Sequence, residues 1–303
     1  MLPAPLPSLD HLILFLSSTP FPPYTPLIPS SLARNFTLTP GGTHADNLTT
    51  NTLILLQDGC YIELITFVPD APQEKIDAHW WGHGKKTRGW VDWCLTSSSP
   101  SPLPPSSEQD KHQSAATTFY KTAGLHTSHT PPLAGARTRP DGVRVEWEVT
   151  FPQGEKGGRD VRGKIPFFCH DITDRGVRVP ISDEATKHEC GALGVRQITV
   201  LVAGEEAREE VVGIYTKLFG KGRTVGEEIL FEVGRVRGVE EWGGAEVVVR
   251  GSRTQEERER VGERGYWVGD IVLGAKADSG KEKGARDRVD EAEGVGGLWI
   301  EYV

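Results

Sequence analysis

Glu63 is a carboxylate inside the otherwise apolar stretch of residues 61–68. If this stretch is a strand, its side chain faces away from its neighbours Ile62 and Leu64, because successive side chains point to opposite faces. An unpaired carboxylate costs several kcal/mol to bury, so a buried Glu63 must be neutralised, paired or bound to a metal ion. On a solvent-facing side it would be only a polar strand residue.

His11 interrupts a second apolar stretch, residues 9–16. One interpretation is a satisfied core histidine, or one that contacts Asp10. The other is a metal ligand, since a neutral imidazole binds Zn, Fe, Ni and Mn alike. The residue type alone does not choose between them.

His44 follows the glycine pair Gly41 and Gly42. The glycines allow a sharp backbone turn and the close approach of a ligand. A histidine at the end of a strand suits general acid/base chemistry or contact with a substrate oxygen. It could equally stabilise a turn, and Asn51 could be a polar contact beside it or a turn residue.

Tryptophans gather in the segment that follows. They lie near His79 and His83 and could wall a pocket for an apolar or aromatic ligand, although ordinary packing would also explain them. These residues are Trp80, Trp81, Trp90 and Trp93. The four cysteines have no CxxC spacing, and we predict buried, reduced thiols without a catalytic role. They are Cys60, Cys94, Cys169 and Cys190.

The composition bounds the class of protein. A chain of 303 residues with 37% hydrophobic residues can bury a core as one large domain or two ordinary ones. Its formal net charge of −8 argues against nucleic acid or an anionic membrane surface as the main partner. No apolar run approaches the roughly 20 residues of a membrane span, and the start MLPAPLPSLD lacks a signal-peptide pattern. We therefore expect a cytoplasmic protein.

Strand patterns dominate the chain. We predict strands over residues 9–16, 35–39, 52–56, 61–68, 90–96, 143–151, 165–172, 195–202, 229–233, 245–250, 267–273 and 298–303. Helical patterns cover residues 108–123, 205–219 and 254–264, whereas the proline-rich segments 20–40 and 100–105 should hold no regular helix. We assign the charged segment 278–294 to a surface loop.

The strands repeat in three related units. LDHLIL, WVDWCL and VRQITV place His11, Asp92 and Gln197 at the same step, and YIELI and WIEYV do so for Glu63 and Glu301. An internal repeat of this kind predicts an α+β fold of strand-rich modules.

Several motifs together resemble the glyoxalase-like domain of fungal and bacterial proteins, in the vicinal oxygen chelate superfamily. They are LDHLILFL, PGGTH followed by TNTLILLQDGCYIELI, HWWG, GWVDWCLTS and IPFFCHDIT. The resemblance covers about residues 8–180. It implies βαβββ modules whose mixed sheets curl into a cup: a domain over 1–182 with modules at about 8–68 and 88–172, and a third related module over 183–303. The first module departs from the pattern, because a proline-rich segment replaces its helix.

The resemblance also implies a function. A divalent metal ion, of a kind that the sequence does not select, would be held by His11, Glu63 and His170, while His44 and Glu63 move protons. The substrate would be a small molecule with adjacent oxygens, and the chemistry that of a lyase, isomerase or dioxygenase.

Other interpretations stay open. If modules one and three pair, the ligand set becomes His11, Glu63, Gln197 and Glu301; we prefer modules one and two because the resemblance runs through both. A metal-free binding protein could use the same cup. The third module could instead be an interaction module that forms a homodimer.

Overall fold

The computed structural model describes residues 6–82, 88–96, 128–154, 157–239, 243–262, 264–277, 280–290 and 297–303. The predicted helix over 108–123 and His83 lie outside these residues. None of the described helices is long and apolar enough to cross a membrane.

The first module is a βαβββ unit. It consists of β1 (Ser8–Phe15), α1 (Ser30–Asn35), β2 (Thr39–His44), β3 (Thr49–Leu55) and β4 (Tyr61–Phe67). The second module follows α2 (Gln73–Ala78) and contains β5 (Gly89–Thr96), β6 (Ser128–His129), β7 (Leu133–Thr138), β8 (Arg144–Thr150), β9 (Pro152–Gln153), the 3-10 helix η2 (Arg159–Val161), β10 (Phe167–Asp171) and α4 (Arg175–Arg178).

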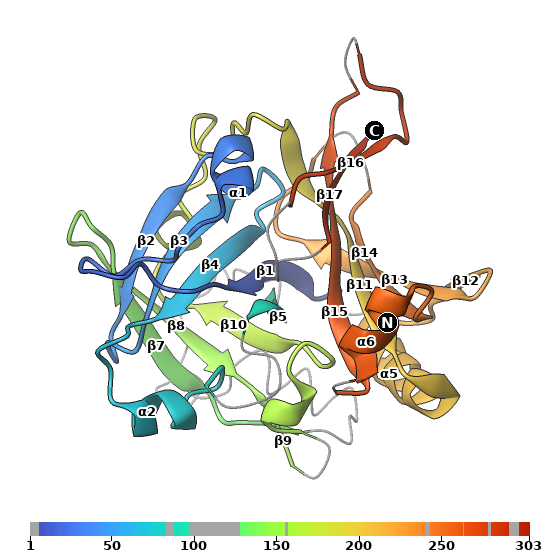
Figure 1. The fold of residues 1–303 in the computed structure, drawn as a ribbon, viewed down its shortest axis with the longest axis horizontal. Coiled ribbons are helices and arrows are strands. Elements are labelled where there is room, and N and C mark those ends of the chain that lie inside the picture. The colour runs from blue at the N-terminus through green and yellow to red at the C-terminus, as the bar shows by residue number, and fades with distance from the viewer. Residues whose placement is uncertain are drawn as a thin grey trace, which may run out of the picture.

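These two modules form a closed ring of strands. The order is β1–β4–β3–β2–β7–β8–β10–β5, and β5 pairs back onto β1 (Figure 1). The pairs β1–β4 and β5–β10 are parallel, whereas β1–β5 is antiparallel. The predicted fold of curled mixed sheets is therefore confirmed.

The C-terminal part repeats this pattern of pairing. It consists of β11 (Ala192–Val202), α5 (Gly204–Phe219), β12 (Arg223–Val225), β13 (Glu228–Arg235), β14 (Ala245–Gly251), α6 (Gln255–Gly262), β15 (Tyr266–Ala275), β16 (Arg286–Arg288) and β17 (Leu298–Tyr302). β11 pairs in parallel with β14 and antiparallel with β15, and β15 pairs in parallel with β17. Residues 183–303 thus contain a βαβββ unit and a shorter second unit, where the sequence indicated one. The short strand β16 lies in a charged segment that its pattern assigns to a loop.

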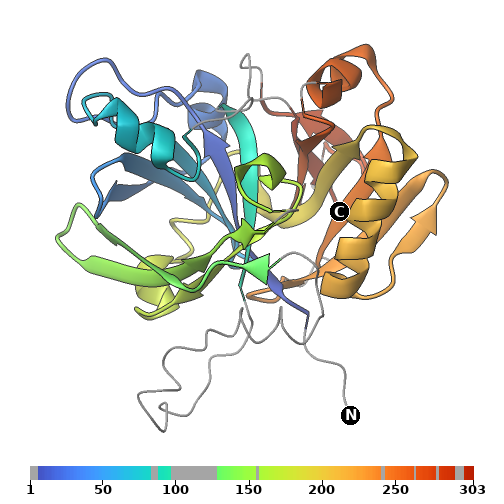
Figure 2. The ribbon, with the colours of Figure 1, turned by 90° about the horizontal axis from the view of Figure 1, so that it is seen from below.

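The two halves share one core. β1 pairs with β13 at their junction, and Figure 2 shows the halves side by side. Trp93 of β5 packs against Tyr215 and Phe219 of α5, with ring centroids 5.9 and 6.3 Å away. The hydroxyl of Tyr215 donates to the carbonyl of Lys164 at 2.7 Å. The outward face of β5 is therefore buried against the C-terminal half.

The proline-rich segment contains a helix after all. α1 begins directly after Pro29, whose fixed φ is compatible with a helix start, and it buries Leu32 fully. Phe36, four residues after Leu32, is also buried, so the segment packs one helical face on the core. The prediction of no helix here is wrong for these six residues. The strand expected over 35–39 starts only at Thr39.

Truncation of Trp93 tests the shared core. We expect Trp93→Ala to lower the free energy of unfolding by about 3–5 kcal/mol, because it leaves a cavity between β5 and α5. Phe21→Ala is the matched control, since Phe21 is 78% exposed, and its effect should stay within about 0.5 kcal/mol. Urea denaturation measures both, and equal effects would contradict a core shared by the two halves.

Candidate functional site

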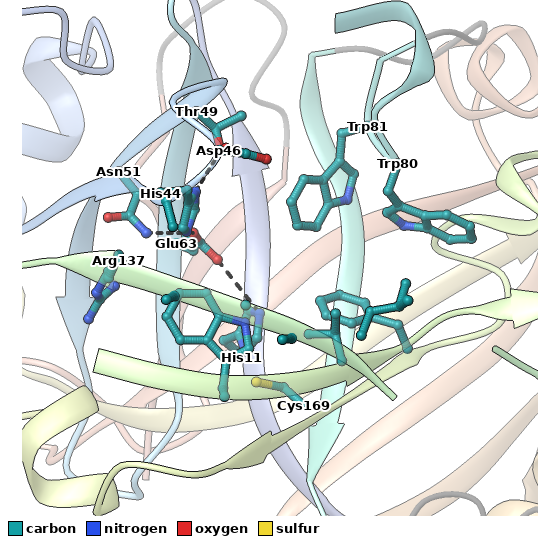
Figure 3. Close-up of a pocket in the computed structure, with 18 of the residues that line it drawn as sticks. His11, His44, Asp46, Thr49, Asn51, Glu63, Trp80, Trp81, Arg137 and Cys169 are labelled. Carbon is teal, nitrogen blue, oxygen red and sulfur yellow. Dashed lines mark hydrogen bonds and ion pairs between the residues drawn. The ribbon is translucent and has the colours of Figure 1, made fainter. Parts of the chain in front are cut away.

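A cavity of about 290 Å³ lies inside the ring formed by the first two modules (Figure 3). Alternation along the strands decides what faces it. On β1, His11 faces the cavity while Leu12 and Leu14 join the core between the halves. On β4, Tyr61 and Glu63 face it, and Ile62 and Leu64 face the core, as the sequence pattern predicts.

His11 presents one particular nitrogen to the cavity. Its Nδ1 lies 2.6 Å from Oδ1 of the buried Asp10, and its ring stacks on Tyr61 with centroids 4.7 Å apart. Because a carboxylate accepts hydrogen bonds, Nδ1 of a neutral imidazole carries the proton. The lone pair of Nε2 is then available on the cavity side, as in a metal-ligating or base histidine.

Glu63 lies between two histidines. Its Oε1 accepts a hydrogen bond from Nδ2 of Asn51 at 2.6 Å. Oε2 is 3.6 Å from Nε2 of His11, and Oε1 is 3.7 Å from Nε2 of His44. Both separations exceed hydrogen-bonding distance, so the carboxylate and the two imidazoles face one another without bonding directly.

His44 ends β2 and is positioned by Thr49. Its Nδ1 lies 2.5 Å from the hydroxyl of Thr49, and its ring contacts Trp147 edge-on at 5.7 Å. Burial lowers the pKa of His44, and the nearby charge of Glu63 opposes this shift. The imidazole of His44 is therefore neutral at pH 7.

The glycines before His44 serve packing. A Cβ on Gly41 would lie 1.9 Å from Oδ1 of Asn51, and one on Gly42 would lie 2.2 Å from the carbonyl oxygen of Thr138. Gly42 also has φ = +120°, which favours glycine. These residues let β2 approach its neighbours and leave room for the amide that holds Glu63, rather than admitting a ligand.

By residue type, His11, His44 and Glu63 would suit a divalent cation. Ligand atoms about 2.0–2.2 Å from one ion lie roughly 3 to 3.6 Å apart. Each histidine comes near this separation from Glu63, but from a different carboxylate oxygen, so one ion bound by all three requires the side chains to draw together. Two imidazoles and a carboxylate suit Zn, Fe, Mn or Ni. A second group consists of Asp10, His11 and Cys94, whose ligand atoms lie within 4.8 Å of one another. It fits less well, because burial raises the pKa of Cys94 well above its ordinary value and keeps it a thiol.

The carboxylate oxygens of Asp10 already accept hydrogen bonds from other side chains, which further disfavours Asp10 as a metal ligand. Its Oδ2 accepts hydrogen bonds from Nη1 of Arg175 at 2.6 Å and from Nη2 of Arg178 at 2.7 Å. Burial alone would raise the pKa of Asp10, but these guanidinium groups and His11 hold it well below its usual range. Asp171 bonds both arginines, and Arg178 also donates to the hydroxyl of Tyr61. Asp10 thus orients His11 from behind.

His170 does not line the cavity. On β10 the side chains of Phe167 and Cys169 face inward, so His170, one residue further, lies on the other face and stacks on Phe168. The expected set of His11, Glu63 and His170 is therefore not brought together. The prediction of an inward-facing His170 is wrong by one residue, because the inward positions of β10 are Phe167 and Cys169.

The alternative set is not assembled either. Glu301 pairs with Arg196 and Arg286, and Gln197 donates to the hydroxyl of Thr199. Neither Gln197 nor Glu301 lines the cavity with His11 and Glu63.

The tryptophans divide between two environments. Trp80 and Trp81 wall the cavity, where Trp80 stacks on Phe151 at 4.4 Å. Trp90 and Trp93 lie in the core between the halves. Asp92 accepts the indole N–H of Trp80 at 2.9 Å, so this residue supports the wall. Burial raises the pKa of Asp92 to about 6, and its hydrogen-bond donors oppose this shift.

The cysteines are free thiols, as predicted, with Cys190 only partly buried. Burial raises the pKa of Cys60 well above its ordinary value and that of Cys190 to about 11. Cys169 lines the cavity, a position that the sequence did not indicate. The sequence also missed the cavity residue Arg137, whose side chain is buried and whose strand lies in an unpatterned segment.

Buried neutral histidines should make stability depend on pH. Burial lowers the pKa of His79, which lines the cavity, and of His170 to about 4. Between about pH 6.5 and 4 the unfolded chain binds these protons and the folded chain does not, so the free energy of unfolding falls as the pH falls. Denaturation at several pH values should show a shallower fall for His79→Gln and for His170→Gln. Variants that parallel the wild type across this window would contradict the shifted pKa values.

Comparisons with known proteins agree with this architecture. A family model described as a glyoxalase-like domain matches residues 9–219. The crystal structure of a hypothetical protein from Staphylococcus aureus superposes with a TM-score of 0.63 at 12% identity, covering 98% of this chain and 100% of that one. This likeness shows a shared fold.

A second solved structure is less similar to this chain. A xylose isomerase-like TIM barrel/4-hydroxyphenylpyruvate dioxygenase fusion protein reaches a TM-score of 0.42 at 12% identity, covering 91% of this chain and 38% of that one. No curated protein matched the sequence.

The family match spans the ring and extends to the end of α5. The chain therefore belongs to the glyoxalase-like domain family of the vicinal oxygen chelate superfamily.

Proposed function

We propose that this protein is an enzyme for a small substrate with two adjacent oxygens, and that His11, His44 and Glu63 hold a divalent metal ion. One observation carries the proposal. Nε2 of His11 and Nε2 of His44 flank the carboxylate of Glu63 at 3.6 and 3.7 Å, at the wall of the cavity. Membership of the glyoxalase-like family supports it.

An ion bound there would act as a Lewis acid toward the two substrate oxygens and would leave coordination positions open to them. Lyase, isomerase and dioxygenase chemistry all use such polarisation. The geometry favours no one of these three.

Side chains behind the two histidines orient them. Asp10 holds the proton of His11 on Nδ1, and the two arginines keep Asp10 ionised. The hydroxyl of Thr49 bonds Nδ1 of His44, as either donor or acceptor. Both imidazoles thus turn Nε2 toward Glu63.

Glu63 is the group that we assign to proton transfer. Asn51 donates to Oε1, whereas Oε2 accepts no hydrogen bond from the described residues and lies nearest Nε2 of His11. A proton removed from the substrate would move to Oε2. His44, which the sequence placed in this role, takes the ligand position expected of His170.

Aromatic side chains form an apolar wall of the site. Trp80, Trp81 and Phe151 form one wall, and their rings contact one another or Phe167. A substrate packed against this wall would displace water and strengthen the interactions of charged groups within the cavity. The same wall provides apolar area for the remainder of the substrate.

A metal-free binding protein is the alternative. In that case His11 and Glu63 would pair with other side chains, and Asp10 and Asn51 do bond them at 2.6 Å each. The same contacts would orient two metal ligands, so the metal content of the protein separates the two functions.

Metal analysis tests the proposal. Protein purified without chelator or affinity tag and supplemented with Zn, Fe, Mn and Ni should contain about one ion per chain. His11→Ala, His44→Ala and Glu63→Ala should lose it while they remain folded by circular dichroism. Asn51→Ala should weaken affinity by about 10- to 100-fold, because it releases Glu63 from its support.

Two control variants discriminate between the ligand sets. His170→Ala and Cys94→Ser should keep the metal, since neither residue belongs to the proposed set. Loss in Cys94→Ser would favour the group of Asp10, His11 and Cys94. No metal in the wild type after supplementation would contradict the metalloenzyme proposal.

A further inference from the structure

Arg137 lies on the inward face of the ring beside the proposed metal ligands. In the register of β2 and β7 it is directly opposite His44. Directly opposed residues of paired strands place their side chains on the same face of a sheet. Arg137 therefore faces the cavity with His44, and it is among the residues that line it (Figure 3).

This guanidinium is buried and forms no ion pair with the described residues. Arg137 is only 4% exposed. Nη2 donates to the carbonyl oxygen of Arg178 at 2.7 Å, and Nε has no hydrogen-bond partner among the described residues. No carboxylate of the described residues lies within ion-pair distance of it; Asp10 and Asp171 are bonded to Arg175 and Arg178 instead.

A buried cation without a counterion is costly unless a ligand supplies one. The guanidinium offers a planar set of donors, which matches a carboxylate in a way that a point charge does not. Glu63 forms no ion pair with Arg137; its charge acts on the guanidinium only from farther away and, in the proposed function, is shared with the metal.

The cavity has an opposite, apolar side. In Figure 3, Arg137 lies on one side of His11 and Glu63, and Trp80 and Trp81 lie on the other. A molecule that spans the cavity would meet a cation at one end, the proposed ligands in the middle and aromatic rings at the other end.

We infer that Arg137 binds a carboxylate of the substrate, so that the enzyme acts on small 2-oxo or 2-hydroxy acids with an apolar or aromatic substituent. This inference rests on the proposed function for the place of the adjacent oxygens. The carboxylate contact itself requires only Arg137 and the cavity.

Calorimetric titration with benzoylformate and its neutral methyl ester tests the inference. Both probes carry the same ring and adjacent oxygens, and only the acid is charged. In metal-free and in metal-supplemented protein, the acid should bind about 10- to 100-fold more tightly than the ester. Arg137→Gln should remove this preference, and Arg137→Lys, which keeps the charge but not the planar donors, should retain part of it.

Arg139→Gln is the matched control. Arg139 is paired with Asp141 and does not line the main cavity, so this variant should bind both probes like the wild type. We expect Arg137→Gln to fold, because it removes a buried charge that has no carboxylate partner. If it does not fold, the comparison of acid and ester in the wild type decides.

Equal binding of acid and ester, no binding of either at millimolar concentration, or an unchanged preference in folded Arg137→Gln would overturn the inference. A preference for the acid in protein that binds no metal would keep the role of Arg137 and contradict the proposed metalloenzyme. Metal binding without a preference for the acid would keep the proposed metalloenzyme and contradict the role of Arg137. The two proposals therefore fail separately.

Discussion

The pairing of β1 on both of its edges is the constraint on which the rest of the structure depends. β1 pairs in parallel with β4 and antiparallel with β5, and this closes the ring of the first two modules. Because β1 and β4 are buried on both faces, each of their positions has only two directions, the cavity or the core. The single-residue alternation of β1 and β4 then forces His11 and Glu63 inward together, while their neighbours bury against the C-terminal half. Site and core are thus set by the same register.

The buried charges around Asp10 extend this constraint. A fully buried carboxylate must be compensated, and the compensation comes from α4, at the end of the second module. Asp10 therefore links the first strand of the ring to its last helix and at the same time fixes the tautomer of His11. Arg137 is the contrasting case within one cavity, because its charge has no such compensation from the described residues. This contrast is what separates a structural ion-pair network from a binding group.

Sequence reasoning succeeded where alternation and local turns decide the structure. The inward position of Glu63, the hairpin at Asp58–Gly59 and the helix α5 all follow from short patterns. It was less successful where tertiary contacts choose among local options. His170 and Cys169 are adjacent, and only the register of β10 against β8 and β5 decides which one faces inward. The role of Arg137 could not be predicted from the sequence, because it depends on which charged side chains lie beside it in the folded chain.

The most direct test of the central claim is anomalous diffraction from crystals grown with zinc, with data collected at the zinc absorption edge. The account predicts one strong peak per chain inside the ring, within about 2.0–2.2 Å of Nε2 of His11, Nε2 of His44 and an oxygen of Glu63. No peak in the cavity of a fully supplemented crystal, or a peak between Asp10 and Cys94, would contradict it.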